Sequence, residues 1–248
     1  MTSRRRALIV AAVAVERDAV TAAGPLLPPS GPEERTLPGG LVLHRLHAGG
    51  AVLDVLAGGV GPAAAAASTA TALTAAALAG EPYDLVLSTG IAGGFAPAAP
   101  LGTVVAAETI VAADLGAQAA DGSFVPVAEL GFGTGAHVVP EEIVRTLAGA
   151  TGAVRGDVLT VSATTGTAAR AAELAERHPR AVAEAMEGFG VAGAAAAHGV
   201  PAGELRTVSN AVGPRDRESW RIKEALGALT DAFGKLIPVL AERAEVAR

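Results

Sequence analysis

Residues 183–217 of this chain, AEAMEGFGVAGAAAAHGVPAGELRTVSNAVGPRDR, contain a carboxylate, a small-residue helix and a strand in close succession. The helix should begin after Glu187 and end at Gly199 and Pro201, because glycine favours a helix end and proline cannot continue the helix. The apolar run that follows predicts a strand with Asn210 at its end. Open α/β sheets bind ligands beyond the carboxyl ends of their strands, so we expect Glu187 and Asn210 to face one pocket.

The remainder of the chain continues this alternation of strands and helices. Ala7–Val15 predicts a first strand with Glu16 at its carboxyl end, and a short helix should begin at Asp18. Further elements are expected at 41–47 and 51–57 (paired strands), 63–78 (a helix almost without charge), 83–88 (a strand before the Gly-rich segment 89–94), 102–111, 158–162, 168–177 and 218–242 (an amphipathic helix). This order predicts an α/β fold, and no linker or repeat divides it, so we expect one domain over residues 1–248.

Composition excludes several classes of function. The net charge of −6 argues against a nucleic acid partner, and the absence of cysteine excludes disulfides and thiolate chemistry. The five histidines lack the spacing of a metal site, so we predict no metal and no cofactor. The uncharged stretches contain Gly, Pro and weakly apolar Ala, which argues against membrane insertion. Residues 4–15 resemble a signal peptide only superficially, because charged residues follow at once, and we expect a cytoplasmic protein.

Taken one at a time, the candidate polar residues have ordinary structural explanations. Glu16 and Glu187 could be acids that favour a helix start, and Asn210 could make a local turn hydrogen bond. The Gly-rich turns match neither a P-loop nor a dinucleotide fingerprint.

Five stretches in order change this interpretation: VAAVAVERDAV (10–20), GGVGPAAAA (58–66), STGIAGGFAPAAPLGTVV (88–105), AMEGFGVA (185–192) and RTVSNAVG (206–213). Together they resemble the nucleoside phosphorylase/nucleosidase superfamily over most of the chain. Within it they resemble the methylthioadenosine/adenosylhomocysteine nucleosidases and, most closely, the futalosine hydrolases of menaquinone biosynthesis. The resemblance implies a three-layer fold with a mixed central sheet flanked by helices.

The resemblance also implies roles for individual residues. Glu16 would activate the hydrolytic water, Glu187 would hold the ribose hydroxyls and Asn210 would contact the purine at N7. The other implied substrate-binding positions are Ala92, Gly93, Thr167 (through its backbone), Met186 and Ser209. An N-ribosidic bond breaks through an oxocarbenium-like sugar, which a carboxylate stabilises while a general base delivers water.

Departures from the nucleosidase pattern narrow the range of expected substrates. Adenine-specific relatives carry Asp where this chain has Asn210, and the amide offers both the donor and the acceptor that a 6-oxopurine needs. Ile91 replaces a serine of the sugar site, and Gly166 stands where an aromatic would stack on the base. Arg215 is a candidate for the carboxylate of futalosine, although a solvated surface arginine is an equal alternative.

We therefore expect hydrolysis of futalosine to release hypoxanthine and dehypoxanthine futalosine. A purine nucleoside phosphorylase acting on inosine or guanosine is the nearest alternative, followed by another nucleosidase and by a non-catalytic nucleoside-binding module. The carboxylate of Glu16 would repel phosphate, which favours hydrolysis. The uncharged helix at 63–78 suggests a homo-oligomer, and the relatives favour a dimer.

Overall fold

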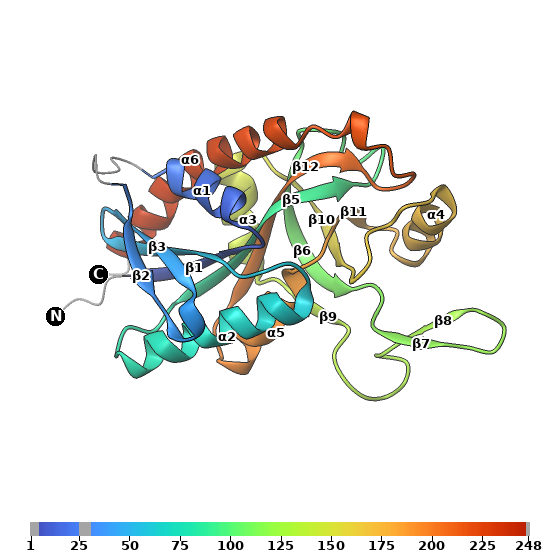
Figure 1. Ribbon diagram of the computed structural model, residues 1–248, viewed down its shortest axis with the longest axis horizontal. Coiled ribbons are helices and arrows are strands. Elements are labelled where there is room, and N and C mark those ends of the chain that lie inside the picture. The colour runs from blue at the N-terminus through green and yellow to red at the C-terminus, as the bar shows by residue number, and fades with distance from the viewer. Residues whose placement is uncertain (1–4, 25–30, 247–248) are drawn as a thin grey trace.

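The computed structural model describes residues 5–24 and 31–246, and within them ten strands form one mixed sheet (Figure 1). The strands of this sheet are β1 (Arg5–Ala11), β2 (Glu33–Thr36), β3 (Val42–Ala48), β4 (Ala51–Ala57), β5 (Leu85–Gly94), β6 (Val104–Ala112), β9 (Ala136–Val138), β10 (Val154–Thr160), β11 (Ala181–Ala185) and β12 (Ala202–Ala211). The helices are α1 (Ala14–Ala22), α2 (Pro62–Leu78), α3 (Glu141–Thr151), α4 (Ala168–Arg177), α5 (Gly188–Ala197) and α6 (Ile222–Val246). This mixed sheet between helices is the α/β architecture expected from the sequence.

Four parallel neighbours, in the order β4-β1-β5-β12, form the middle of the sheet. On one side the sheet continues through the antiparallel strands β3 and β2. On the other side it continues through β6, β10 and β11, and β11 turns back to pair with the end of β5. The carboxyl ends of β5, β11 and β12 therefore meet at one place.

Two layers of helices cover the sheet (Figure 1). On one face α6 packs against α1, α3 and the strands β5 and β12, with the buried side chains of Leu229, Phe233 and Leu236 at the centre of this layer. On the other face α2 packs against α5, which in turn contacts β5, β6 and β12. The α2–α5 contact is made of small residues: Gly190 of α5 lies so close to Pro62 that an added Cβ would be 2.0 Å from its carbonyl oxygen.

Two expected boundaries were wrong at the edge that carries the polar residues. The first strand ends at Ala11 rather than Val15, and Glu16 lies in the first turn of α1 instead of at a strand end. The apolar run Ala11–Val15 hides this change, because the alanines and valines of a strand end and of a helix start look alike. The Gly-rich segment 89–94 is not a turn but the second half of β5, which pairs with β12 throughout and with β11 at Gly93 and Gly94.

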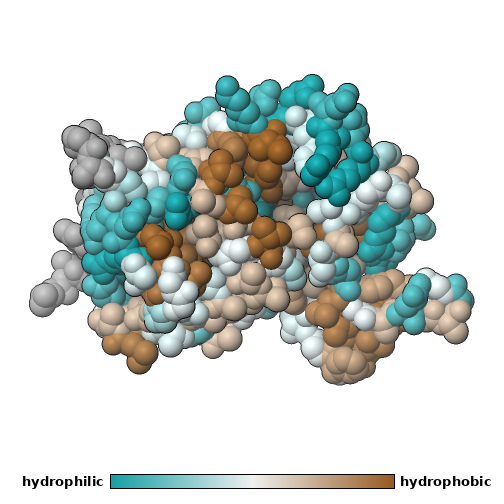
Figure 2. Space-filling view, in the orientation of Figure 1, coloured by the Kyte–Doolittle hydropathy of each residue, from teal (hydrophilic) through white to brown (hydrophobic). Residues whose placement is uncertain are grey.

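The short strands β7 (Gly116–Gln118) and β8 (Phe124–Pro126) form a separate hairpin that projects from the body of the molecule. Figure 2 shows hydrophobic residues gathered near the base of this projection. Leu115, directly before β7, and Phe132, in the segment after β8, are exposed. The sequence did not predict these strands, nor β2, β9, β11 and α3.

Candidate active site

A cavity of about 260 Å³ opens at the carboxyl ends of β1, β5 and β12. Its walls include Ala12 after β1, residues 91–93 of β5, residues 184–187 at the end of β11 and directly after it, and residues 209–215 at the end of β12 and directly after it. Parallel strands place functional residues at this edge of an α/β sheet. The position of the cavity is therefore the one that the sequence pattern predicts for a ligand site.

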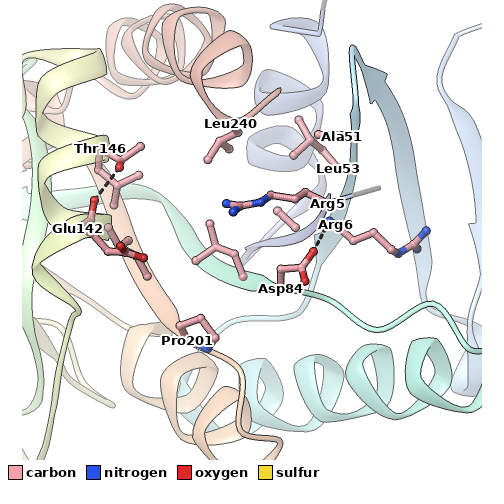
Figure 3. Close-up of a pocket in the computed structure, with 13 residues that line it drawn as sticks. Arg5, Arg6, Ala51, Leu53, Asp84, Glu142, Thr146, Pro201 and Leu240 are labelled. Carbon is pink, nitrogen blue, oxygen red and sulfur yellow. Dashed lines mark hydrogen bonds between the residues drawn. The ribbon is translucent and has the colours of Figure 1, made fainter. Parts of the chain in front are cut away.

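A second cavity, of about 100 Å³, lies at the amino ends of the same strands (Figure 3). There the backbone N–H of Arg6 donates to Asp84, and Leu53, Leu147, Pro201 and Leu240 supply apolar wall. Beside it the buried Asp54 accepts hydrogen bonds from Arg45, Arg6 and the hydroxyl of Tyr83. These hydrogen bonds connect β1, β3, β4 and the segment before β5. The polar residues at this end of the sheet therefore have a structural role.

Glu16 is held by backbone donors at the bottom of the first cavity. Its side chain is only 4% exposed. One carboxylate oxygen accepts from the N–H groups of Ala12 and Val13, at 3.0 and 3.3 Å, and the other accepts from the N–H of Ile91 at 2.9 Å. The helix start and β5 thus fix the carboxylate together, and the glycine at position 90 leaves the space that it occupies.

Glu187 belongs to a buried ionic network at the start of α5. Its carboxylate accepts from the backbone N–H of Gly61 at 3.1 Å and from the guanidinium of Arg206 at 3.2 Å. Arg206, 1% exposed, also donates to Glu204 at 2.8 Å and to the hydroxyl of Ser88 at 3.0 Å. One arginine therefore joins two carboxylates from inside the sheet.

The charges in this network shift one another's pKa. Burial raises the pKa of the Glu204 carboxyl, against the opposing effect of Arg206, and the charge of Glu187 adds to the rise. For Arg206, burial alone would lower the pKa of the guanidinium, but the carboxylates of Glu204, Glu187 and Glu16 outweigh it and raise the pKa. Arg206 is therefore a permanent cation, fully engaged by its neighbours.

Asn210 stands at a break in strand register. The pairing of β12 with β5 shifts between Val208 and Asn210, so that Asn210 pairs with Gly93. Such irregularities redirect side chains near functional sites. The side-chain oxygen of Asn210 accepts from the Ser209 hydroxyl at 2.8 Å and its NH2 donates to the carbonyl of Ala211 at 3.0 Å. Each end of the amide keeps one further hydrogen-bonding position for a ligand.

The cavity brings together most of the residues that the sequence singled out. Its lining includes Glu16, Ala92, Gly93, Met186, Glu187, Ser209, Asn210 and Arg215. Thr167 is not among the lining residues: it is exposed, and its hydroxyl accepts from the N–H of Arg170 at the start of α4. Thr164 and Thr165 of the same loop line the cavity instead.

Sequence reasoning missed three buried charged residues near the cavity. Arg206 lies within the run 205–208 that was interpreted as an apolar strand, Glu204 directly precedes that run, and Glu184 lies in β11, which was not predicted. The sequence did contain a signal for these residues. A charged residue inside an apolar strand must have a partner if the strand is buried, so such a residue indicates a buried ion pair.

Among residues 5–24 and 31–246 no cluster of His, Asp or Glu is arranged to hold a metal ion. In the same part of the chain no helix combines the length and the apolar character needed to cross a membrane.

Comparison with known proteins identifies the family of this chain. The family model of the phosphorylase superfamily matches residues 6–241. The futalosine hydrolase of Streptomyces coelicolor is 65% identical over 94% of this chain and 95% of its own length. The futalosine hydrolase of Acidothermus cellulolyticus is 45% identical over 92% of this chain and 89% of its own length.

Solved structures agree on the fold. The structure of a futalosine hydrolase mutant of Helicobacter pylori superimposes with a TM-score of 0.79 at 18% identity, covering 94% of this chain and 98% of the other. From the match to the family model and the extended identity to curated relatives, the chain belongs to the phosphorylase superfamily and, within it, to the futalosine hydrolase family of N-glycosyl hydrolases.

Proposed function

We propose that this protein hydrolyses the N-ribosidic bond of futalosine and releases hypoxanthine and dehypoxanthine futalosine. The observation that carries the proposal is the shared cavity of Glu16, Glu187 and Asn210, two buried carboxylates and an amide on separate elements. The names of the relatives from S. coelicolor and A. cellulolyticus support futalosine as the substrate. A single nucleosidase domain over residues 1–248 is part of the same proposal.

In this mechanism the C–N bond to the base lengthens before water attacks, so positive charge develops on the sugar. Glu187 accepts hydrogen bonds from the ribose 2′- and 3′-hydroxyls and stabilises that charge, with Met186 beside the sugar. Glu16 takes a proton from the attacking water, and the water oxygen bonds to the anomeric carbon. The electron pair of the broken bond goes to the purine, which takes up a proton from solvent at N7 and leaves as the neutral base with Asn210 as hydrogen-bond partner. Glu16 then returns the proton of the attacking water to solvent.

The charges around the cavity support hydrolysis over phosphorolysis. Among the described residues that line it, Arg215 is the one cation, and it lies just beyond the end of β12. Arg206 lies deeper, but its donors are engaged by Glu204, Glu187 and Ser88. A phosphate beside Glu16 would meet a carboxylate without a free cation to balance it.

The side of the cavity formed by residues 213–220 supports recognition of a long 5′ substituent. The guanidinium of Arg215 lies 5.7 Å from the ring centre of Trp220, and both residues line the cavity. An aromatic ring and a cation together match the carboxyphenyl group of futalosine, which is apolar along its length and charged at its end.

The same proposal assigns the protein to menaquinone biosynthesis in the cytoplasm and to a homo-oligomer, a dimer in the first instance. The outer face of α2 supports association, since it carries no charge and consists mainly of alanines, with Thr71, Thr74 and Leu78, which is 85% exposed. Size-exclusion chromatography with light scattering tests this part. A monomer at micromolar concentration would contradict it.

The decisive experiment measures hypoxanthine release from futalosine and from inosine, each with and without phosphate, with methylthioadenosine as a control. We expect release from futalosine without phosphate. Phosphate-dependent cleavage of inosine would make the protein a phosphorylase and remove the role given to Glu16.

A second experiment tests the base directly. Glu16→Gln should lower kcat by about 10²- to 10⁴-fold, the usual contribution of a general base, while substrate binding stays within a few-fold. Unchanged turnover would refute the assignment.

A further inference from the structure

Glu184 is a buried carboxylate in the cavity wall that the proposed reaction does not use. It lies in β11, lines the cavity and is 6% exposed. Thr165 holds it with two hydrogen bonds, from its backbone N–H at 2.8 Å to one oxygen and from its hydroxyl to the other. A charge removed from water in this way is expensive unless it meets a partner. Thr165, in the loop that follows β10, therefore fixes the direction of the Glu184 side chain.

The sheet places Glu184 opposite Asn210 across a single glycine. Gly93 of β5 pairs with Glu184 on one side and with Asn210 on the other. Residues that pair across strands project from the same face of a sheet. Glu184 and Asn210 are therefore two strand spacings apart, about 9.5 Å between their backbones, and they point the same way.

Gly93 keeps the space between them open. A Cβ at this position would lie 3.3 Å from the side-chain nitrogen of Asn210 and 3.0 Å from a methyl of Val212. All three residues line the cavity. The result is a slot with an amide at one side, a carboxylate at the other and bare backbone between, which suits a flat ring system.

A 6-oxopurine completes the chemistry of this slot. With N7 and O6 at Asn210, the next group around the ring is N1–H, a donor that needs an acceptor. We propose that Glu184 accepts a hydrogen bond from N1–H of the leaving base and so determines specificity for 6-oxopurines, an inference that rests on the proposed function. Adenine carries a lone pair at N1, which would face the carboxylate without a proton between them.

Thr165 does not saturate the carboxylate. An ionised carboxylate has about four lone-pair positions, and Thr165 uses two of them. The remaining positions accept from the base, while Thr165 prevents the side chain from rotating away. The inference therefore makes Glu184 the substrate contact and Thr165 the residue that orients it.

The test uses free bases, so it does not depend on which nucleoside is cleaved. Calorimetry would give the Kd of hypoxanthine, 1-methylhypoxanthine and adenine for the unmodified protein, for Glu184→Ala and for the control Glu142→Ala. The control removes a carboxylate of α3 that lines the cavity at the opposite end of the sheet and does not line the nucleoside cavity. Glu184→Gln, which keeps one acceptor oxygen and the shape of the side chain, serves if the alanine variant does not fold.

We expect the unmodified protein and Glu142→Ala to prefer hypoxanthine over 1-methylhypoxanthine by about 10- to 150-fold, the worth of one hydrogen bond to a charged group. In Glu184→Ala the preference should fall to within about threefold, and in Glu184→Gln it should be intermediate. An unchanged preference in the Glu184 variants would overturn the inference and leave the proposed function standing. Binding of adenine but not hypoxanthine to the unmodified protein would overturn both.

Discussion

Replacing Gly90 by alanine tests the placement of Glu16 without altering Glu16 itself. A Cβ at Gly90 would lie 2.5 Å from the carboxylate oxygen of Glu16 that accepts from Ile91, and 3.0 Å from the other. The backbone of Gly90 has a φ of +137°, where L-residues are strained by about 1–3 kcal/mol. Because the carboxylate ends a flexible side chain, the clash is relieved by its displacement and not by movement of the sheet.

The substitution should have two separate effects, one on the melting temperature and one on kcat. The backbone strain of about 1–3 kcal/mol should lower the melting temperature by roughly 2–12 °C in a chain of this size. Displacement of the base should lower kcat by about 10²-fold or more, with KM changed much less, because a misplaced general base loses most of its contribution. Activity should therefore fall far more than stability.

Hypoxanthine release and thermal unfolding, measured on the same samples, check both numbers. Gly149→Ala is the matched control: it lies in α3, has open space around it and should stabilise the fold by about 0.4–1 kcal/mol without affecting turnover. If Gly90→Ala kept kcat within threefold of the unmodified protein, the fixed position of Glu16 would not matter and the reasoning would fail.

Three further predictions concern the buried polar residues. Asn210→Asp should lower kcat/KM for 6-oxopurine nucleosides by about 10²-fold or more and raise the relative activity on methylthioadenosine. The reason is that a carboxylate accepts a hydrogen bond from a 6-amino group but repels a 6-oxo group. Equal losses of kcat/KM on both substrates would contradict this prediction. Gly188→Ala should destabilise the fold by roughly 1–3 kcal/mol, seen in urea unfolding, since its Cβ would lie 2.3 Å from a carboxylate oxygen of Glu204. Glu204→Gln should make unfolding less sensitive to pH. Because burial raises the folded-state pKa of Glu204 above its ordinary 4.5, the folded state binds the extra proton, and this contribution to stability is present below pH 4.5 and lost as pH rises through the folded pKa. As pH rises above 4.5, the melting temperature of Glu204→Gln should therefore increase relative to that of the unmodified protein. A difference between the two melting temperatures that does not change with pH would refute the raised pKa of Glu204.

The elements that the sequence predicted well are those whose own residues determine them. The helix after Glu187 ends where glycine and proline require, and the paired strands at 42–48 and 51–57 show regular apolar patterns. Glu16, Glu187 and Asn210 were singled out as polar residues at the ends of elements, although each alone also has an ordinary structural explanation. The resemblance to a family then connected them.

The parts that could not be predicted depend on contacts between distant segments. Arg206 is buried with Ser88 and Glu187 of other elements as partners, and Glu204 is buried against Arg206. Glu16 was placed at a strand end because nothing local distinguishes Ala11 from the helix that begins three residues later. The slot between Glu184 and Asn210 arises from a pairing of β11 with β5 that has no local signal.

The glycines of β5 have a consequence for how substrate preference can change in this family. Added side chains at positions 90, 93 and 94 would meet Glu16, Asn210 with Val212, and the Ala99 carbonyl respectively. These three positions therefore resist larger side chains, and the pocket cannot easily be reshaped from them. New preferences should come from Ile91 and Ala92, which line the cavity, and from the residues of β11, β12 and the loops that follow them, where libraries intended to alter the accepted base belong.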